Sequence, residues 1–183
     1  MTTTLTTTRL RLEPLEPGHL AGLNRMNADP EVMRYLAAGR PEPIDETRAV
    51  IERVQQRWAE FGYSWWAFVE HETQQLVGAG AIQNLRREGT ALPDPTCPLE
   101  IGWRLRRDRW GHGLALEAAR AMGDFAFKTL DAPELLSVCD PANTASANVM
   151  KRLGMREIGL QRWYGKDLLT YRIDADRWIA AAT

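Results

Sequence analysis

The sequence has few of the residues that build metal centres and disulfide frameworks. Only two cysteines and three histidines occur among its 183 residues. Cys97 and Cys139 form no CxxC motif, and His19, His71 and His112 are scattered along the chain. Because this spacing offers no recognisable ligand set, we expect neither a structural nor a catalytic metal. Two cysteines without a framework pattern are typical of reduced thiols, so we expect a cytoplasmic protein.

The chain also lacks a secretory signal, a membrane-spanning run and an excess of one charge. Its first residues, MTTTLTTTRL, contain no charged segment followed by an apolar core, so we expect no signal peptide. No apolar run approaches the ~18 residues that a bilayer-spanning helix needs. Lys and Arg number 23 against 24 Asp and Glu, so no global basic surface favours nucleic acid. We therefore expect neither a membrane nor a nucleic-acid partner.

What remains is the composition of an ordinary globular protein, with 44% hydrophobic and 26% charged residues. A chain of this length can bury roughly 70% of its unfolded surface without a disulfide or metal. The sequence shows no internal repeat and no long linker. We therefore expect a single domain over residues 1–183.

Turn residues divide the chain into alternating strands and helices of a mixed α/β domain. Apolar periodicity predicts helices at 19–36, broken at Asp29-Pro30, and at 46–61, 114–128 and 143–153. Asp45 is the expected N-cap of the second of these helices, and Gly62 its end. Strands are expected at 9–15, 64–70, 76–85, 99–105, 135–139, 157–160 and 168–174, and three prolines mark residues 86–98 as a loop.

The segment 99–125 places a strand, a basic glycine turn and a helix in direct succession. Gly111 and Gly113 supply flexible backbone where the strand passes to the helix, and the first helical amides have no intrahelical partner. Those amides and the helix dipole favour phosphate oxygens, and four arginines (Arg104, Arg106, Arg107 and Arg109) crowd the same segment. The turn lacks the third glycine of a dinucleotide-binding motif and the Gly-Lys-Ser/Thr of a Walker loop. We interpret it as a diphosphate site of another kind.

Glu100 is the most conspicuous polar residue of the predicted strands. Alternation places Glu100, Gly102 and Arg104 on one face of the strand. A carboxylate within an apolar strand needs a partner or a function, and burial would raise its pKa toward that of a general base. A cross-strand ion pair or an edge position would also explain Glu100. Gly102 leaves an open slot in which a ligand could lie.

The segment 99–125 resembles motif A of the GNAT acetyltransferase superfamily, whose Gln/Arg-x-x-Gly-x-Gly/Ala turn binds the pyrophosphate of coenzyme A. The matching positions are Trp110, Gly113 and Ala115, and the tryptophan departs from Gln/Arg toward the Trp-Gly-x-Gly-x-Ala form of the ribosomal-protein N-terminal acetyltransferase branch. Segments 8–12, 29–36, 100–103, 140–146 and 151–155 resemble the same branch, in the same order, between Leu5 and Trp178.

This resemblance implies a mixed, mostly antiparallel central sheet that splays after the strand carrying Glu100, with helices on both faces. It also implies acetyl-CoA as co-substrate, with the pantetheine arm near 103–105 and the pyrophosphate at 111–115. The implied cofactor-binding residues are Trp103, Leu105, Arg106, Trp110, Gly111, His112, Gly113, Leu114, Ala115 and Asn143. Asn143 is equally well suited to cap a helix, and His112 to lie exposed in a turn.

The resemblance further implies Glu100 as general base for the acceptor amine. Many superfamily members carry a proton-donating tyrosine three residues before the Leu-Gly pair, where this chain has Met150. Ser146 is the group we expect to assist the departing thiolate in its place. Trp163 and Tyr164, beside Gly165 and between two strands, are the candidates for contacting the acceptor, with core packing as the alternative.

Taken together, these observations predict an acetyl-CoA-dependent N-acetyltransferase that acts by direct transfer. The expected acceptor is the N-terminal α-amine of a protein or peptide. The alternatives are a small amine, such as an aminoglycoside or polyamine, and a non-catalytic coenzyme A-binding module. Homodimers are frequent in the superfamily, so a homodimer is expected by analogy.

Overall fold

A computed structural model describes residues 2–36, 38–89 and 94–181. Its contacts group the chain into two compact units, one of Met1–Ala81 with Trp103–Ala121 and the other of Ile82–Gly102 with Met122–Thr183. Hydrogen-bonded neighbours among the strands follow the order β1-β2-β3-β4-β5-β6-β8-β7. The fold is a mixed α/β fold with an eight-stranded, mostly antiparallel sheet among the described residues, which confirms the fold class that the resemblance implies. Residues 90–93 of the expected loop lie outside the described residues.

The first unit contains an antiparallel meander. Its strands are β1 (Leu5–Thr6), β2 (Leu10–Pro14), β3 (Trp65–Glu70) and the first part of β4 (Leu76–Asn84), and each pairs with the next. Leu10 and Leu12 are fully buried, as expected for alternating residues on one face of a sheet. A Cβ on Gly78 in β4 would lie 2.7 Å from the Phe68 ring, so this position accepts only glycine.

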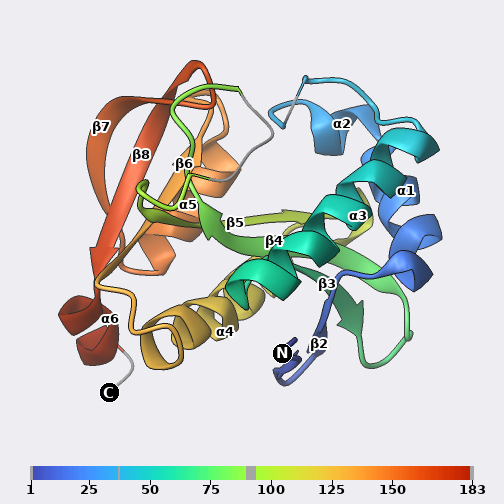
Figure 1. The fold of residues 1–183 in the computed structure, drawn as a ribbon, viewed down its shortest axis with the longest axis horizontal. Coiled ribbons are helices and arrows are strands. Elements are labelled where there is room, and N and C mark those ends of the chain that lie inside the picture. The colour runs from blue at the N-terminus through green and yellow to red at the C-terminus, as the bar shows by residue number, and fades with distance from the viewer. Residues whose placement is uncertain (1, 37, 90–93, 182–183) are drawn as a thin grey trace. The chain divides into compact units, whose positions relative to one another are not determined.

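Three helices complete this unit: α1 (Leu20–Asn27), α2 (Pro30–Met33) and α3 (Ile44–Phe61). The expected break between α1 and α2 is confirmed, because the Asp29 carboxylate accepts a hydrogen bond from the Glu31 amide at 2.9 Å and Pro30 follows at the first helical position. Helices α1 and α3 lie side by side (Figure 1). Trp58 of α3 meets Trp66 of β3 edge to face, with ring centroids 4.9 Å apart.

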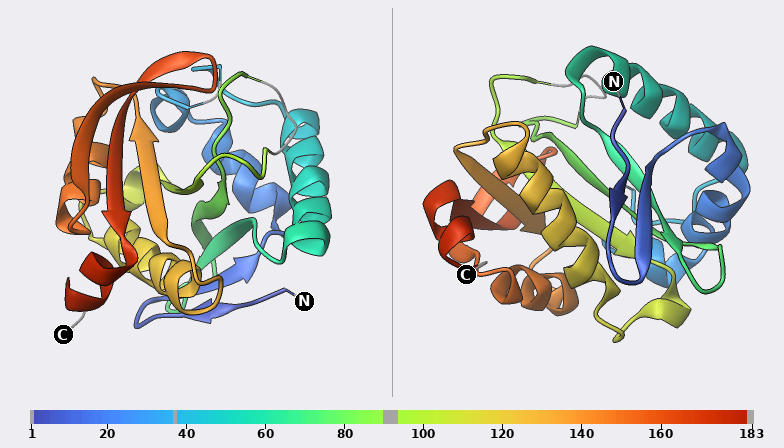
Figure 2. Two further views of the ribbon diagram at one scale, coloured as in Figure 1. Left: turned by 60° about the vertical axis from the view of Figure 1, so that its left-hand side comes forward. Right: turned by 90° about the horizontal axis from the view of Figure 1, so that it is seen from below.

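The second unit is built around the antiparallel strands β6 (Glu134–Cys139), β8 (Lys166–Asp174) and β7 (Arg156–Trp163), which lie side by side in Figure 2. Strand β5 (Leu99–Leu105) pairs with β6 in parallel, in a register that joins Glu100 to Leu136. This is one paired position between β5 and β6 among the described residues, although β5 continues to Leu105. The splay that the resemblance implies stays a prediction.

The helical segments of this unit are the end of α4 (Leu114–Lys128), α5 (Thr144–Arg152) and α6 (Ala175–Ala181). The Asn143 side chain caps α5 by accepting a hydrogen bond from the Ser146 amide at 3.2 Å. Gly154 follows this helix with φ of 83°, as expected for a C-terminal glycine. On α6, the Trp178 indole donates to the Asp124 carboxylate of α4 at 2.8 Å.

Four predicted boundaries are wrong by two or three residues: α2 ends at Met33, β8 begins at Lys166, and α3 and β7 also differ. Helix α3 begins at Ile44 after Pro43, whose extended backbone and carbonyl cap it, so Asp45 lies in the first turn and pairs with Arg48 at 2.6 Å. Strand β7 extends to Trp163, which leaves Tyr164 and Gly165 as a two-residue turn. A register shift near Gly159 and exposed polar residues obscure the strand alternation there. Strand β1 and helix α6 were not predicted.

Candidate active site

Glu100 lies on β5 of the second unit and is 8% exposed. Its Oε2 atom accepts a hydrogen bond from Nε2 of Gln83 on β4 at 3.0 Å and another from the hydroxyl of Tyr164. The Gln83 amide also donates to the Tyr164 hydroxyl oxygen at 3.1 Å. The two side chains therefore form a closed network on one carboxylate oxygen. Neither of these partners is charged, so the ion pair considered from the sequence is not the explanation of Glu100.

The surroundings of Glu100 favour its protonated form. Burial raises the pKa of Glu100, while hydrogen bonds from Gln83 and Tyr164 and the charge of Arg86 lower it by less. Burial and the neighbouring Glu100 carboxylate also raise the pKa of Tyr164, which keeps its hydroxyl protonated. Glu100 is therefore a stronger base than an exposed glutamate and has a hydrogen-bond donor fixed beside it.

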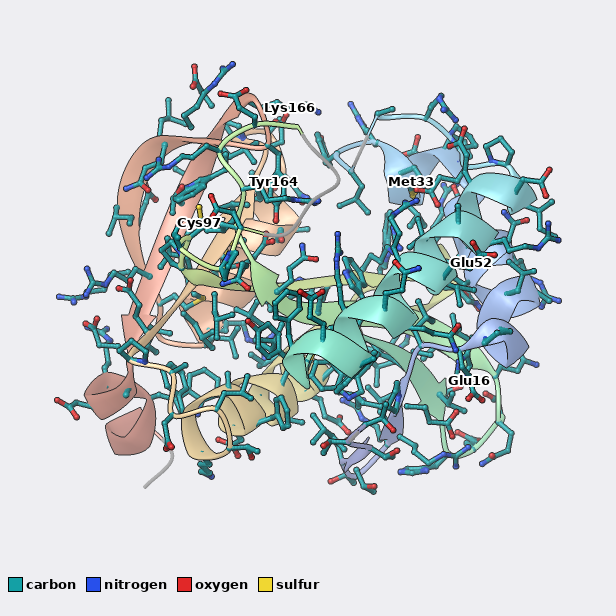
Figure 3. All side chains as sticks on the ribbon, in the orientation of Figure 1. Glu16, Met33, Glu52, Cys97, Tyr164 and Lys166 are labelled. Carbon is teal, nitrogen blue, oxygen red and sulfur yellow. The ribbon has the colours of Figure 1, made fainter. Side chains whose placement is uncertain are left out.

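The β7–β8 turn places Tyr164 (Figure 3). Tyr164 and Gly165 have φ of 53° and 71°, the left-handed pair that a two-residue hairpin turn requires. Their amides donate to the carbonyls of Arg86 and Arg87 at 2.7 and 2.9 Å, and the Arg86 guanidinium lies over the Tyr164 ring at 5.1 Å. The Tyr-Gly pair between two strands was a visible signal for this turn. No local pattern pointed to Gln83.

Trp163 precedes this turn, but its side chain is 1% exposed and packs with Leu85 and Leu136. The Arg87 guanidinium lies 4.1 Å from its ring centre. This placement favours the packing alternative for Trp163. The role of Tyr164 toward an acceptor stays a prediction.

Asn143 and Ser146 lie at the N-terminal end of α5, also in the second unit. Capping occupies the Oδ1 atom of Asn143, but its amide nitrogen has no hydrogen-bond partner within 2–36, 38–89 and 94–181. The Ser146 hydroxyl likewise has no partner in those ranges. Met150 is 1% exposed and lies in the core. Asn143, the predicted cofactor ligand, and Ser146, the group predicted to assist the thiolate, therefore each retain a donor without a partner among the described residues.

The glycine turn belongs to the first unit. Gly111 and Gly113 have φ of 79° and 78°, and α4 begins directly after them. A Cβ on Gly111 would meet no atom within 4 Å, so backbone is open there. The Glu117 amide donates to the Gly113 carbonyl at 3.1 Å as the helix starts. The amides of 114–116 precede this bond and are available to an anion.

The other predicted cofactor residues of this unit differ in what they expose. Leu114 is 2% exposed, so its backbone amide rather than its side chain can meet a ligand. The Trp110 indole is 46% exposed and donates to the Leu105 carbonyl at 2.9 Å. His112 is exposed, and its carbonyl accepts from Arg9 at 2.8 Å. Trp103 and Ala115 are half-buried.

Three of the four arginines lie in or beside the turn. Arg106 pairs with Asp108 at 2.6 Å and Arg109 with Glu70 at 3.1 Å, while Arg107 is exposed. The expectation for Arg104 is wrong, because its guanidinium stacks over the Trp65 ring at 4.9 Å instead of joining the turn. A cavity of about 510 Å³ adjoins the basic segment; its lining is Arg25, Met26, Asp29, Val32, Arg106, Arg107 and Asp108.

Within the part of the chain that the structure describes, no cluster of three or more His, Cys, Asp and Glu side chains could hold a metal ion. The helices in those same ranges also include none with the length and apolar character to cross a membrane.

A sequence profile of the acetyltransferase (GNAT) domain matches residues 9–156, which is most of the chain. The chain belongs to the GNAT acetyltransferase family. The family resemblance seen in the sequence is thereby confirmed, and the protein is an N-acetyltransferase of a family that uses acetyl-CoA as co-substrate.

Several GNAT relatives align along most of this chain. It is 27% identical to the uncharacterised N-acetyltransferase p20 of Bacillus licheniformis over 89% of this chain and 88% of the relative. It is 32% identical to the FsC-acetyl coenzyme A-N(2)-transacetylase of Aspergillus fumigatus over 85% of this chain and 66% of that protein. The crystal structure of an Agrobacterium tumefaciens acetyltransferase matches with a TM-score of 0.77 and 30% identity, over 94% of this chain and 95% of that one.

Proposed function

We propose that this GNAT protein transfers the acetyl group of acetyl-CoA directly to a primary amine, with Glu100 as general base. The observation that carries the proposal is a buried carboxylate with a raised pKa, held by two neutral hydrogen-bond donors on β4 and the β7–β8 turn. A protein that only binds coenzyme A would gain nothing from burying this charge. The geometry therefore favours an enzyme over a binding module.

The chemistry has three proton transfers and one acyl transfer. The acceptor ammonium gives one proton to Glu100, and the nitrogen lone pair then attacks the thioester carbonyl. The N–C bond forms, the C–S bond breaks, and its electron pair leaves with the sulfur. The second nitrogen proton passes to the thiolate, and Glu100 releases the first proton to solvent. The products are the N-acetyl amide, the coenzyme A thiol and one proton.

Acetyl-CoA would be held mainly through backbone. The free amides after Gly113 suit the pyrophosphate, and exposed Arg107 adds a positive charge beside them. The free amide nitrogen of Asn143 suits a carbonyl of the pantetheine arm. We keep Ser146, whose hydroxyl is also free, as the group that hydrogen-bonds the departing sulfur.

The acceptor that we propose is the N-terminal α-amine of a protein or peptide. An α-amine has a pKa near 7.7–8.0, against about 10.4 for a lysine side chain. A single carboxylate base therefore removes a proton more readily from the α-ammonium group, which is the stronger acid of the two. The balanced net charge of −1 also gives no strong attraction for polycationic acceptors.

A small-molecule amine is the second candidate. It is favoured by the Aspergillus fumigatus relative, whose name denotes an FsC N(2)-transacetylase. For this chain the small-molecule alternative rests on that likeness alone.

The deciding experiment measures release of the coenzyme A thiol from acetyl-CoA with panels of peptides, polyamines and aminoglycosides. We expect turnover with peptides and a loss of about 10²- to 10⁴-fold in kcat/KM for Glu100→Gln, the usual contribution of a general base. Calorimetry with acetyl-CoA should show unchanged binding by this variant. Binding of acetyl-CoA without release in any panel would instead support the coenzyme A-binding module.

A further inference from the structure

The two oxygens of the Glu100 carboxylate have different surroundings. Oε2 accepts both hydrogen bonds, from Gln83 at 3.0 Å and from Tyr164. Oε1 accepts none from any residue within 2–36, 38–89 and 94–181. Because an ionised carboxylate has about four lone-pair sites, Oε1 keeps its full capacity to accept a proton. The residue as a whole is 8% exposed.

The two donors come from distant parts of the sequence, and Tyr164 is held in place by contacts of its own. Gln83 lies 17 positions before Glu100, and Tyr164 lies 64 positions after it. Tyr164 adopts a left-handed backbone that a bulky residue rarely takes. The hydrogen bond from its backbone amide to the Arg86 carbonyl and the Arg86 guanidinium over its ring hold it there. Such an unfavourable conformation persists where the surrounding structure imposes it, often beside a functional group.

We propose that Gln83 and Tyr164 are positioning residues that hold Oε2 of Glu100, so that Oε1 is the atom that takes the proton from the acceptor amine. This inference rests on the function proposed above. The carboxylate plane is fixed by two donors on one oxygen, and the base presents a single, defined atom. Tyr164 thus acts through Glu100 rather than by contacting the acceptor.

The test is the pH dependence of kcat/KM for Tyr164→Phe, which removes only the hydroxyl. The groups that face Glu100 are Gln83, Tyr164 and the Arg86 cation, all of which favour its ionised form. Loss of the hydroxyl should move the acidic limb of the profile to higher pH and lower kcat/KM about 10-fold at neutral pH, with KM for acetyl-CoA unchanged. Gln83→Met should also move the acidic limb to higher pH. This variant provides a second measurement that does not involve the β7–β8 turn.

The chain offers a matched control in Tyr171→Phe. The Tyr171 hydroxyl donates to the Glu157 carboxylate at 2.9 Å, so this change removes another tyrosine–glutamate hydrogen bond within the same unit. The acidic limb should stay in place for this variant. In the Glu100→Gln background, Tyr164→Phe should cost no further activity, because its effect passes through the carboxylate.

Two results would overturn the inference. One is an acidic limb that does not move in Tyr164→Phe or Gln83→Met while Glu100→Gln remains inactive, which would leave the proposed function standing. The other is a raised KM for the acceptor in Tyr164→Phe with an unmoved limb, which would make Tyr164 an acceptor contact. Full activity of Glu100→Gln would refute the proposed function itself, so the two failures are distinguishable.

Discussion

The hydroxyl of Tyr164 donates a hydrogen bond to Oε2 of Glu100 across 64 positions of sequence. The bond joins β5, the strand of segment 99–125, to the turn between β7 and β8. Gln83 completes the arrangement from β4. A buried carboxylate is thus supplied with hydrogen bonds but without a paired cation, so it remains costly to ionise. This combination suits a base and reduces stability at neutral pH.

Glu100→Gln should therefore stabilise the folded protein at neutral pH while removing activity. Burial raises the pKa of Glu100 above its unfolded value, despite the opposing hydrogen bonds from Gln83 and Tyr164. Its contribution to stability is then full below the unfolded pKa and is lost as the pH rises through the folded pKa. Glutamine does not titrate, so the variant escapes that loss.

Thermal unfolding at pH 4, 6 and 8 checks this prediction. The melting temperature of Glu100→Gln should exceed that of the wild type by a few degrees at pH 8, and the two should converge near pH 4. For a chain of this size each 1 kcal/mol corresponds to about 2–4 °C. A variant that melts lower than the wild type by the same amount at every pH would contradict the argument.

Gly111→Ala should weaken acetyl-CoA binding more than it weakens the fold. The φ of 79° at Gly111 is unfavourable for alanine by about 1–2 kcal/mol, and the added methyl group would occupy the open space before α4. We expect KM for acetyl-CoA to rise about 10-fold with little change in kcat. Steady-state kinetics at saturating acceptor measures both values.

Gly159→Ala is the control for this change. Gly159 on β7 has φ of 87° and, like Gly111, no atom within 4 Å of an added Cβ. It should lose comparable stability with KM for acetyl-CoA unchanged. Equal KM values for the two alanine variants would remove Gly111 from the cofactor site.

Asn143 carries two roles that substitution can separate. Asn143→Ala removes both the cap of α5 and the free amide nitrogen, and loss of such a cap costs about 1 kcal/mol. Asn143→Asp keeps a capping oxygen but has no amide donor. We expect the alanine variant to lose stability and affinity for acetyl-CoA, and the aspartate variant to lose affinity alone. Calorimetry and thermal unfolding of both variants provide the readouts; unchanged affinity in the aspartate variant would leave Asn143 with capping only.

The sequence predictions are accurate where the interactions are local in the sequence and fail where they join distant residues. Strand β5 and helix α4 span the predicted residues, because alternation and helical periodicity are local patterns. Glu100 stood out for the same reason, as a carboxylate within an apolar strand. The cap of α3 was misplaced by two residues because Pro43 supplies a backbone cap that no side-chain rule detects.

The partners of Glu100 could not be read from the sequence in this way. Gln83 and Tyr164 reach it only through strand pairing and the geometry of a two-residue turn. Arg104 shows the converse, since its neighbours in the sequence place it with the phosphate-binding arginines but its side chain stacks on Trp65. Tertiary contacts decide the direction of such long side chains.

The last prediction concerns Glu117, which ties the start of α4 to the segment before β2. Its carboxylate accepts hydrogen bonds from the Thr7 hydroxyl at 2.6 Å, from the Arg9 amide at 2.8 Å and from the Arg9 guanidinium at 2.7 Å. Burial raises the pKa of Glu117, but these bonds outweigh it and the net pKa lies below the usual value. Glu117 therefore stabilises the fold above its unfolded pKa, and this contribution is lost as the pH falls through the folded pKa.

Glu117→Gln should consequently lower the melting temperature at pH 7. This decrease in melting temperature should become smaller as the medium is acidified below pH 4.5. Loss of hydrogen bonds to a charged, mostly buried group is worth about 1–2 kcal/mol. Glu46→Gln is the matched control, because Glu46 pairs with Arg40 at 2.8 Å while both side chains are about half exposed, and such pairs contribute little. Because Arg9 also holds the His112 carbonyl, Glu117→Gln should raise KM for acetyl-CoA, whereas Glu46→Gln should not. If both variants melt alike at pH 7, the Arg9–Glu117 pair contributes no more stability than an exposed pair, and equal KM values would mean that it does not support the glycine turn.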